Sequence, residues 1–221
     1  MPAIHFPGES QKYRAARDEL LRAEMALRRQ TEDVARQRRE LPLGGRVARD
    51  YVFQTMDDRE IRLSELFAPE KNTLVVYSYM FGPGAKSPCS SCTSIIDSLD
   101  GEAPHIEQRV NVVVVAKSPP SRIREVAAAR GWHNLRFLSS ADTSYNADYF
   151  AEDEKGNQMP MLNVFVKRDG GIYHTYGSEL LYAPKEPGMD GRHVDMIWPL
   201  WNMFDLTPDG RGTTWGPKLT Y

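Results

Sequence analysis

Two apolar runs without alternating polar residues constrain the fold of this chain more than any other feature. Residues 74–80 and 112–116 are rich in β-branched and aromatic side chains, which is typical of strands covered on both faces. The segment between them has helical character over residues 92–108, although Gly101 and Pro104 interrupt it. A buried strand, a crossover helix and a second buried strand predict a parallel sheet of the α/β class.

Further elements extend this sheet. A second crossover helix is expected over residues 121–130, because Ser121 is a favourable N-cap and Gly131 a favourable helix end. Two strand-like segments, 161–167 and 172–176, flank an Asp-Gly dipeptide, which favours the tight turn of a β-hairpin. Shorter strands are expected at residues 51–54, 60–63 and 135–138. We therefore predict a central mixed sheet flanked by helices.

The N-terminal part predicts one long helix over residues 10–40, which are rich in Arg, Glu, Ala and Leu and contain neither Gly nor Pro. Apolar side chains recur at every seventh position: Tyr13, Leu20, Leu27, Val34 and Leu41. The positions three residues further on are small or polar, so a strong coiled coil is not expected. We predict that this helix packs on the body of the protein or against a partner subunit.

Beyond Gly177 the chain is rich in Pro, Gly, Trp and Asp, with one helix-compatible stretch at residues 193–204. Trp198, Trp201 and Trp215 predict that this segment covers an apolar surface, and a homodimer interface is one such surface. We therefore expect a helical extension, an α/β domain and a C-terminal covering segment. Their expected boundaries are residues 1–42, 43–176 and 177–221.

Charge and hydropathy exclude several classes of protein. With 41% hydrophobic and 26% charged residues, the composition is that of a globular chain. The net charge of −2, from 28 basic and 30 acidic residues, supplies no field that would attract nucleic acid or an anionic membrane. No apolar run approaches the roughly 20 residues that span a bilayer, and the N-terminus lacks the pattern of a secretory signal. We expect a cytoplasmic protein that binds neither nucleic acid nor membrane.

The two cysteines carry the clearest chemistry. Cys89 and Cys92, separated by two serines, follow a predicted buried strand and a Gly-Pro-Gly loop and open a helix. A helix N-terminus lowers the pKa of a thiol from about 8.5 to roughly 3.5–7.5, and the spacing places the second sulfur one turn deeper. We predict an enzyme in which Cys89 attacks a disulfide and Cys92 resolves the mixed disulfide. This reaction requires no cofactor.

Two other uses of the pair stay open. A Cys-x-x-Cys motif is half of a zinc site, but the chain has no other cysteine and its histidines show no repeating metal spacing, so we expect no metal. A metal carrier would need His174 or another ligand beside the thiols to hold copper or zinc. His174 is also a candidate proton donor, although a single histidine on a strand is usually structural. The remaining alternative is a pair of thiols that only pack.

A second motif points to a known family. Met159-Pro160 precedes an apolar strand, a basic residue, a glycine turn and another strand, an arrangement that resembles the late half of thioredoxin. In that family the proline is cis and lies beside the dithiol, where the adjoining backbone pairs with a bound substrate segment. The resemblance implies that Pro160 is cis and that Met159 lines a substrate-binding peptide groove.

A closer resemblance covers nearly the whole chain. The long charged helix and five short motifs resemble the thioredoxin-like family known as domain of unknown function 899. These motifs occupy residues 51–53, 63–67, 77–83, 169–176 and 205–208. The resemblance implies a thioredoxin-like fold and a dithiol-disulfide oxidoreductase related to alkyl hydroperoxide reductases. Its partners would be a protein or small-molecule thiol or disulfide and an external reductant.

The chain also departs from its presumed relatives. Pro88 precedes the first cysteine where thioredoxin has Trp, Ser90-Ser91 replaces Gly-Pro, and Tyr77 occupies the place of a buried acid. A peroxiredoxin would carry Thr three residues before its reactive cysteine, but Lys86 stands there and no arginine partner is evident. A peroxiredoxin-like peroxide reductase is therefore the second hypothesis. A metal-binding or non-catalytic interaction protein of the same fold is the third.

Overall fold

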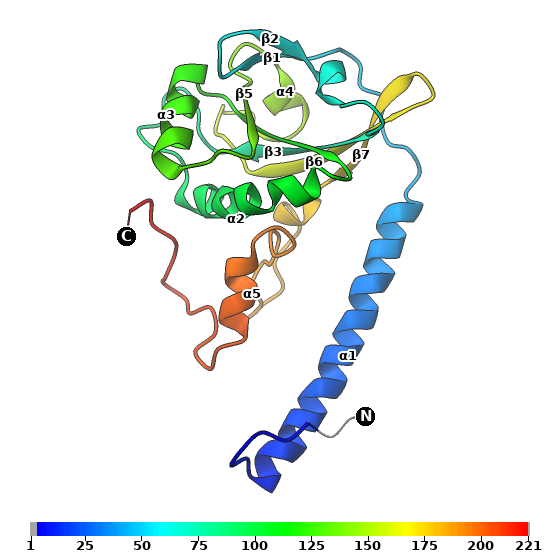
Figure 1. Cartoon of the computed structure of the whole chain (residues 1–221), viewed down its shortest axis with the longest axis vertical. Helices are drawn as coiled ribbons and strands as arrows, with labels where there is room; N and C mark the ends of the chain where they lie inside the picture. The colour runs from blue at the N-terminus through cyan, green and yellow to red at the C-terminus, as the bar shows by residue number, and fades with distance from the viewer. Residues whose placement is uncertain (1–3, 221) are drawn as a thin grey trace. The chain divides into compact units, whose positions relative to one another are not determined.

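One mixed sheet organises the protein (Figure 1). The computed structural model describes residues 4–220, and within them the strand order is β2-β1-β5-β4-β3-β6-β7. The strands are β1 (Val52–Thr55), β2 (Glu60–Arg62), β3 (Thr73–Tyr79), β4 (Asn111–Ala116), β5 (Arg136–Ser139), β6 (Met161–Arg168) and β7 (Gly171–Gly177). Strands β3, β4 and β5 are parallel, whereas β6 is antiparallel to both β3 and β7. The predicted mixed α/β sheet is confirmed.

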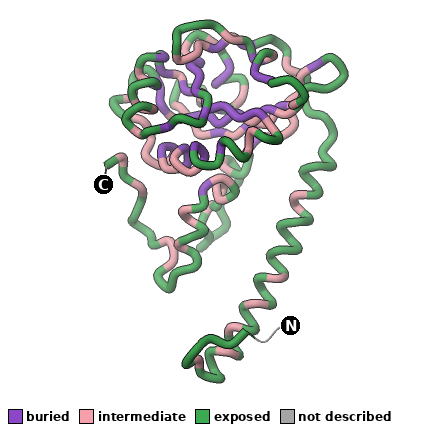
Figure 2. The backbone as a smooth tube through the Cα atoms, viewed as in Figure 1, coloured by how far each residue is buried: buried purple, intermediate pink, exposed green. Residues whose placement is uncertain are grey.

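The sheet buries both of its faces, as the apolar runs predict. Every residue of β4 is buried, and the buried stretches of the chain are concentrated in the sheet and the helices against it (Figure 2). The side chains of β3 alternate between two clusters. Tyr77 and Tyr79 face α2 (Ser90–Ile106) and α3 (Pro120–Arg130), whereas Leu74 and Val76 face η1 (Leu63–Leu66) and α4 (Tyr145–Asp148). Because successive side chains of a strand point to opposite faces, β3 contributes to both cores.

The two crossover helices differ from expectation at their ends. Helix α2 begins at Ser90 and continues through Pro104 to Ile106, so the expected interruption does not occur. The prediction that Ser121 caps α3 is wrong, because that helix begins at Pro120. Proline suits the first turn of a helix, where its missing N–H would have no intrahelical partner. Gly131 ends α3 in the left-handed conformation, with φ of 71°, as expected.

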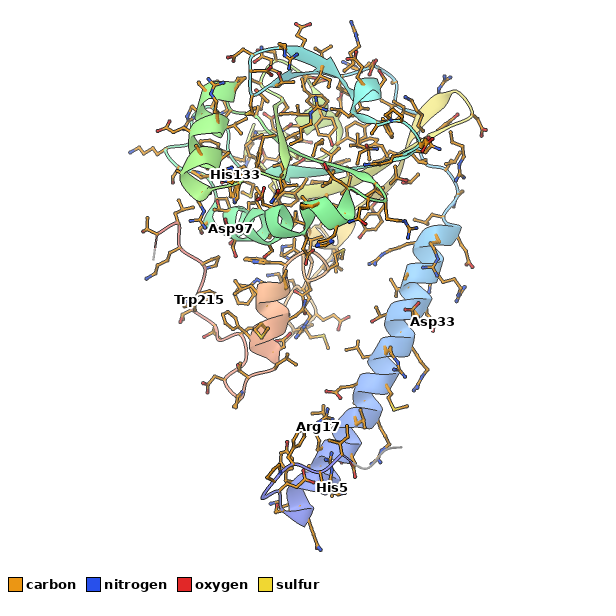
Figure 3. All side chains as sticks on the ribbon, viewed as in Figure 1. His5, Arg17, Asp33, Asp97, His133 and Trp215 are labelled. Atoms are coloured by element: carbon orange, nitrogen blue, oxygen red, sulfur yellow. The ribbon has the colours of Figure 1, made fainter. Side chains whose placement is uncertain are left out.

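Two aspartates of α2 fasten it to the chain that follows α3. Asp97 lies on α2 (Figure 3). Its carboxylate accepts hydrogen bonds from Trp132 Nε1 at 2.8 Å and Arg130 Nε at 3.2 Å. Asp100 is buried and accepts main-chain N–H groups of Asn134 and Leu135, each at 3.0 Å. Since α2 begins at the cysteines, these bonds also hold in place the helix that carries the dithiol.

The N-terminal residues form a unit of their own. The chain divides into the compact units Met1–Pro42 and Leu43–Tyr221, and the first contains the predicted long helix, α1 (Gln11–Glu40). The Ser10 side chain caps α1 by accepting the N–H of Tyr13 at 3.1 Å. No residue of α1 is buried within this unit, and the packing of its apolar stripe on the body of the protein or against a partner subunit stays a prediction.

The C-terminal segment packs on α2. Trp198 is buried and donates from Nε1 to Ser94 Oγ at 3.0 Å. Its ring also contacts Trp201, the first member of a series of edge-to-face contacts that extends to Phe204 and Trp215. Helix α5 (Pro199–Asp205) is shorter than expected and starts at Pro199, because the residue before a proline avoids helical dihedrals. No helix in the described part of the chain is long and apolar enough to cross a bilayer.

Candidate active site

Cys89 occupies the N-cap position of α2, just beyond the end of the central strand β3. Its own N–H donates to the carbonyl oxygen of Met80 at 3.1 Å, which holds the loop back against the strand. Its sulfur accepts the main-chain N–H of Cys92 at 3.4 Å. Cys89 is half-buried, whereas Cys92 is only 2% exposed, and both are free thiols. The structure therefore brings the two predicted cysteines together, with Cys89 on the accessible side.

The setting of the two sulfurs separates their acidities. A hydrogen bond from the Cys92 thiol, opposed by burial and helped by the amides of Cys92 and Ser91, lowers the pKa of Cys89 to about 6. The same thiol–thiol hydrogen bond, followed by burial and the charge of Cys89, raises the pKa of Cys92 well above its usual range. At neutral pH the pair therefore holds a thiolate at Cys89 and a proton at Cys92.

Two tyrosines of β3 lie close to the dithiol. The hydroxyl of Tyr77 is buried and has no well-formed hydrogen bond among the described residues. The Cys92 thiol is the polar group next to it, and the interaction moderates the raised pKa of Cys92. Tyr79, by contrast, shares a 2.6 Å hydrogen bond with Thr93 Oγ1, which in turn donates to the Cys89 carbonyl oxygen at 2.9 Å.

Arg122 of α3 holds the loop that precedes Cys89. Its guanidinium donates to the carbonyl oxygens of Pro83 at 2.8 Å and Gly82 at 3.3 Å, and also to that of Ala85. The same group lies 4.6 Å from the centroid of the Phe81 ring. Sequence reasoning missed this residue, because only the fold places α3 beside the loop and no local motif marks it.

A cavity of about 570 Å³ opens beside Cys89. One wall is the loop that Arg122 holds, and the opposite wall comes from the segment between Glu152 and Gln158. Lys117 and Glu152 form an ion pair within the lining. Gln158 is held in place by Asn146, whose Nδ2 donates to its Oε1 at 2.9 Å. The cysteine thus lines a recess that contains an ion pair and is large enough for a small molecule or a short chain segment.

Pro160 does not have the predicted conformation. No peptide bond between residues 4 and 220 is cis, so the prediction of a cis Pro160 is wrong. Met159 N–H donates to the carbonyl oxygen of Ala151 at 2.8 Å, and the next peptide bond has the trans form, which is the more stable one. Gln158 lines the Cys89 cavity, whereas Met159 and Pro160 are half-buried outside it. Substrate binding by Met159 and Pro160 stays a prediction.

His174 lies apart from the dithiol. It belongs to β7 and lines a different cavity, where its Nε2 is 2.9 Å from Asn163 Oδ1. Among residues 4–220, no group of three or more His, Cys, Asp or Glu side chains is arranged to hold a metal ion. The structure therefore does not bring His174 to the cysteines, either as a proton donor or as a metal ligand.

The fold and the position of the dithiol define a class of protein. A central parallel strand ends at the cysteine-capped helix, and an antiparallel hairpin completes the sheet beside it, so the fold is thioredoxin-like, as expected. The chain belongs to the family described as "Bacterial protein of unknown function (DUF899)", whose model matches residues 4–220. The resemblance drawn from the sequence motifs is confirmed.

Solved structures similar to the chain include peroxiredoxin-like and thioredoxin proteins. Peroxidoxin BcpB from Mycobacterium tuberculosis is 20% identical, with a TM-score of 0.48, over 72% of this chain and 95% of that one. A peroxiredoxin-like protein from Aquifex aeolicus is 19% identical, with a TM-score of 0.46, over 62% and 75%. An exposed lipoprotein thioredoxin from Streptococcus pneumoniae is 13% identical, with a TM-score of 0.44, over 67% and 96%. No functionally curated protein matches the chain.

Proposed function

We propose that this protein is a dithiol-disulfide oxidoreductase in which Cys89 is the attacking thiolate and Cys92 the resolving thiol. The observation that carries the proposal is the asymmetry of the pair. Cys89 is accessible, accepts the Cys92 N–H and has a pKa near 6, whereas Cys92 is buried and holds its proton. A thiolate is the reactive species in disulfide exchange, so this arrangement assigns the first attack to Cys89.

The reaction proceeds in two displacements. The Cys89 thiolate attacks one sulfur of the substrate disulfide, forms a mixed disulfide and releases the first substrate thiolate. Cys92 then loses its proton and attacks the Cys89 sulfur, which forms the internal disulfide and releases the second substrate thiolate. Two electrons pass from the dithiol to the substrate. An external thiol reductant restores the pair by the reverse chemistry.

The first displacement prepares the second. The hydrogen bond to Cys89 and the charge on Cys89 are two of the three main causes of the high pKa of Cys92. Once Cys89 is in a mixed disulfide, its sulfur is neutral and both causes are removed, so the pKa of Cys92 falls. The Tyr77 hydroxyl and the main chain of Met80 both lower the pKa of Cys92, and we assign the Tyr77 hydroxyl the role of positioning and hydrogen-bonding the second thiolate as it forms.

The redox equilibrium of the pair tests this proposal. Purified protein is equilibrated with glutathione buffers, and the oxidised fraction is read by alkylation and mass spectrometry. We expect one reversible internal disulfide with a potential between about −270 and −120 mV, the range of known dithiol oxidoreductases. Thiols that never pair, or pair only after unfolding, would overturn the assignment.

A peroxide reductase is the second candidate, because Cys89 is a half-exposed thiol with a pKa of about 6, and such thiols form sulfenic acids readily. In that reaction Cys89 would displace water or an alcohol from the peroxide, and Cys92 would then condense with the sulfenic acid and release water. Several N–H groups of the Arg122 guanidinium already donate to loop carbonyl oxygens, so these groups are not free to polarise a bound peroxide. Stopped-flow consumption of hydrogen peroxide by reduced protein distinguishes the two candidates.

A further inference from the structure

A second cavity, of about 1000 Å³, is larger than the one at Cys89 and shares no lining residue with it. It lies against the outer strands β6 and β7, between the chain that follows α4 and the short helix η2 (Glu179–Leu181). The proposed exchange chemistry makes no use of it. Cavities of this size with apolar walls and a few converging polar groups are typical of small-molecule sites.

Four residues, Tyr149, Phe150, His174 and Tyr182, contribute aromatic rings to the walls of this cavity. The rings of Phe150 and Tyr182 meet edge to face with centroids 6.2 Å apart, and those of Tyr149 and His174 lie 5.5 Å apart. Tyr182 is anchored by a hydrogen bond from its hydroxyl to the Phe150 carbonyl oxygen at 2.7 Å. The structure therefore holds several aromatic rings around one space.

Phe150 has an unfavourable backbone conformation. Its φ of 56° lies in the left-handed region, which is unfavourable for a bulky residue and is found mostly where the surrounding structure imposes it. Its ring is nevertheless 65% exposed, so core packing does not explain the conformation. Tyr182 is 48% exposed on the same cavity. Strained and exposed aromatic residues at a cavity indicate a surface that is kept for a ligand.

The charges in the lining favour a cation. Asp148 and Glu179 contribute two carboxylates. Asp148 accepts hydrogen bonds from the hydroxyls of Ser144 and Tyr51, and the positive charge of Arg49, outside the lining, acts on it as well. The cation in the lining is Arg46, whose side chain packs against Gly171 and also lines a separate, basic cavity.

The floor of the cavity adds no positive charge. Asn163 is 1% exposed and donates from Nδ2 to the carbonyl oxygen of Tyr149, so its Oδ1 accepts from Nε2 of His174. Burial lowers the pKa of His174, so the imidazole is neutral at pH 7. The aromatic walls and the two carboxylates are thus not opposed by a charged histidine.

We propose that this cavity is a binding site for a small organic ammonium ion, with Tyr149, Phe150 and Tyr182 contacting the cation and Asp148 and Glu179 balancing its charge. Aromatic faces attract ammonium groups through the ring quadrupole, and a quaternary ammonium is too weakly hydrated to prefer water strongly. The apolar rim accommodates the carbon substituents of such an ion. The site is independent of the dithiol chemistry.

Choline and its uncharged isostere 3,3-dimethylbutan-1-ol are the probes that test this site. Each is titrated into the reduced full-length protein, and binding is read by saturation-transfer NMR and calorimetry. We expect choline to bind at least about tenfold more tightly than the alcohol, because the two differ in charge but hardly in shape. Equal binding of the two compounds, or binding of neither, would overturn the proposal.

Variants locate the binding. Tyr182→Ala and Glu179→Gln should each weaken choline binding several-fold, whereas Tyr182→Phe, which keeps the ring, should retain it. Tyr13→Ala removes an exposed tyrosine of α1 and Cys89→Ser alters the other cavity, so neither should change the affinity. Circular dichroism confirms that each variant is folded. Unchanged choline binding in both Tyr182→Ala and Glu179→Gln would show that choline binds elsewhere and would refute the assignment.

Discussion

The sulfur of Cys89 accepts the main-chain N–H of Cys92 at a distance of 3.4 Å. This bond joins the first turn of α2 to the thiolate, so the helix stabilises the charge with a fixed donor as well as with its dipole. The Cys92 thiol adds a second donor and keeps its own proton. The low pKa of Cys89, and with it the reactivity of this cysteine, thus depends on the proton that Cys92 keeps.

Alkylation of Cys89 should follow its low pKa. We expect the rate of reaction with iodoacetamide to rise through a midpoint near pH 6, because the thiolate fraction increases as pH passes the pKa. Cys92→Ala removes the thiol donor and should move the midpoint upward, toward the usual value of about 8.5. Ser98→Ala, further along the same helix, serves as the control and should leave the midpoint unchanged. A midpoint near 8.5 in the native protein would contradict the assigned asymmetry.

Replacing Cys89 and replacing Cys92 should stop the reaction at different steps. Cys89→Ser removes the attacking group, so turnover with a disulfide substrate should be lost. Cys92→Ser leaves the first displacement intact but removes the second, so a stable mixed disulfide should accumulate. Intact mass spectrometry under non-reducing conditions measures both outcomes. Undiminished turnover by Cys89→Ser would eliminate the proposed mechanism.

Tyr77 and Tyr79 form a matched pair for testing the role of the buried hydroxyl. Tyr77→Phe removes the polar group at Cys92, so release of product from the mixed disulfide should slow by about tenfold or more, while alkylation of Cys89 is retained. The pH profile of the release step should shift upward, which a purely structural change would not produce.

Tyr79→Phe should behave differently, because its hydroxyl bonds Thr93 and not a thiol. Leaving the Thr93 hydroxyl without this partner should lower the free energy of unfolding by about 1–2 kcal/mol, with little effect on the release step. Urea denaturation and single-turnover kinetics on both variants measure the contrast. If the two variants slow release equally, Tyr77 has no special role.

Arg122→Ala should loosen the loop before Cys89. Three carbonyl oxygens, those of Gly82, Pro83 and Ala85, lose their guanidinium donor, so we expect a loss of about 2–3 kcal/mol of unfolding free energy. Arg122→Lys should not restore it, since one ammonium cannot reach the same set of acceptors. Arg124→Ala, on the same helix, removes an exposed side chain that donates to the Met56 carbonyl oxygen and pairs with Asp58, and it should cost less than about 1 kcal/mol. Thermal unfolding of the three variants makes the comparison.

Local patterns in the sequence were sufficient for the sheet centre and the dithiol. The run at residues 74–80 became β3 (Thr73–Tyr79), and the hairpin segments became β6 and β7 with slightly longer bounds. Strand burial and turn chemistry act over a few residues, so they are visible in the sequence. Cys89 and Cys92 lie within one turn of one helix, and their proximity needs no tertiary information.

The rest of the site depends on contacts between distant segments. Arg122 reaches the loop before Cys89, and Lys117 and Gln158 reach the cavity at Cys89, only because β4, α3 and the chain before β6 converge at the end of β3. The prediction of a cis Pro160 rested on the resemblance to thioredoxin and is wrong. The hydrogen bond between Met159 and Ala151 beside this proline is another contact between separate segments that the local sequence does not reveal. Helix α2 runs through Pro104 because packing and the anchored Asp100 outweigh a poor local propensity.

The strand order also has a consequence for synthesis on the ribosome. β1 lies between β2 and β5, and β3 lies between β4 and β6, so each of these early strands has one partner that is encoded soon after it and one that is encoded much later. The cysteine-bearing helix therefore emerges well before β6 completes the sheet beside it. During that interval β3, beyond whose end the cysteine-bearing helix begins, has one unpaired edge, so the nascent chain is more prone to aggregation than the finished protein.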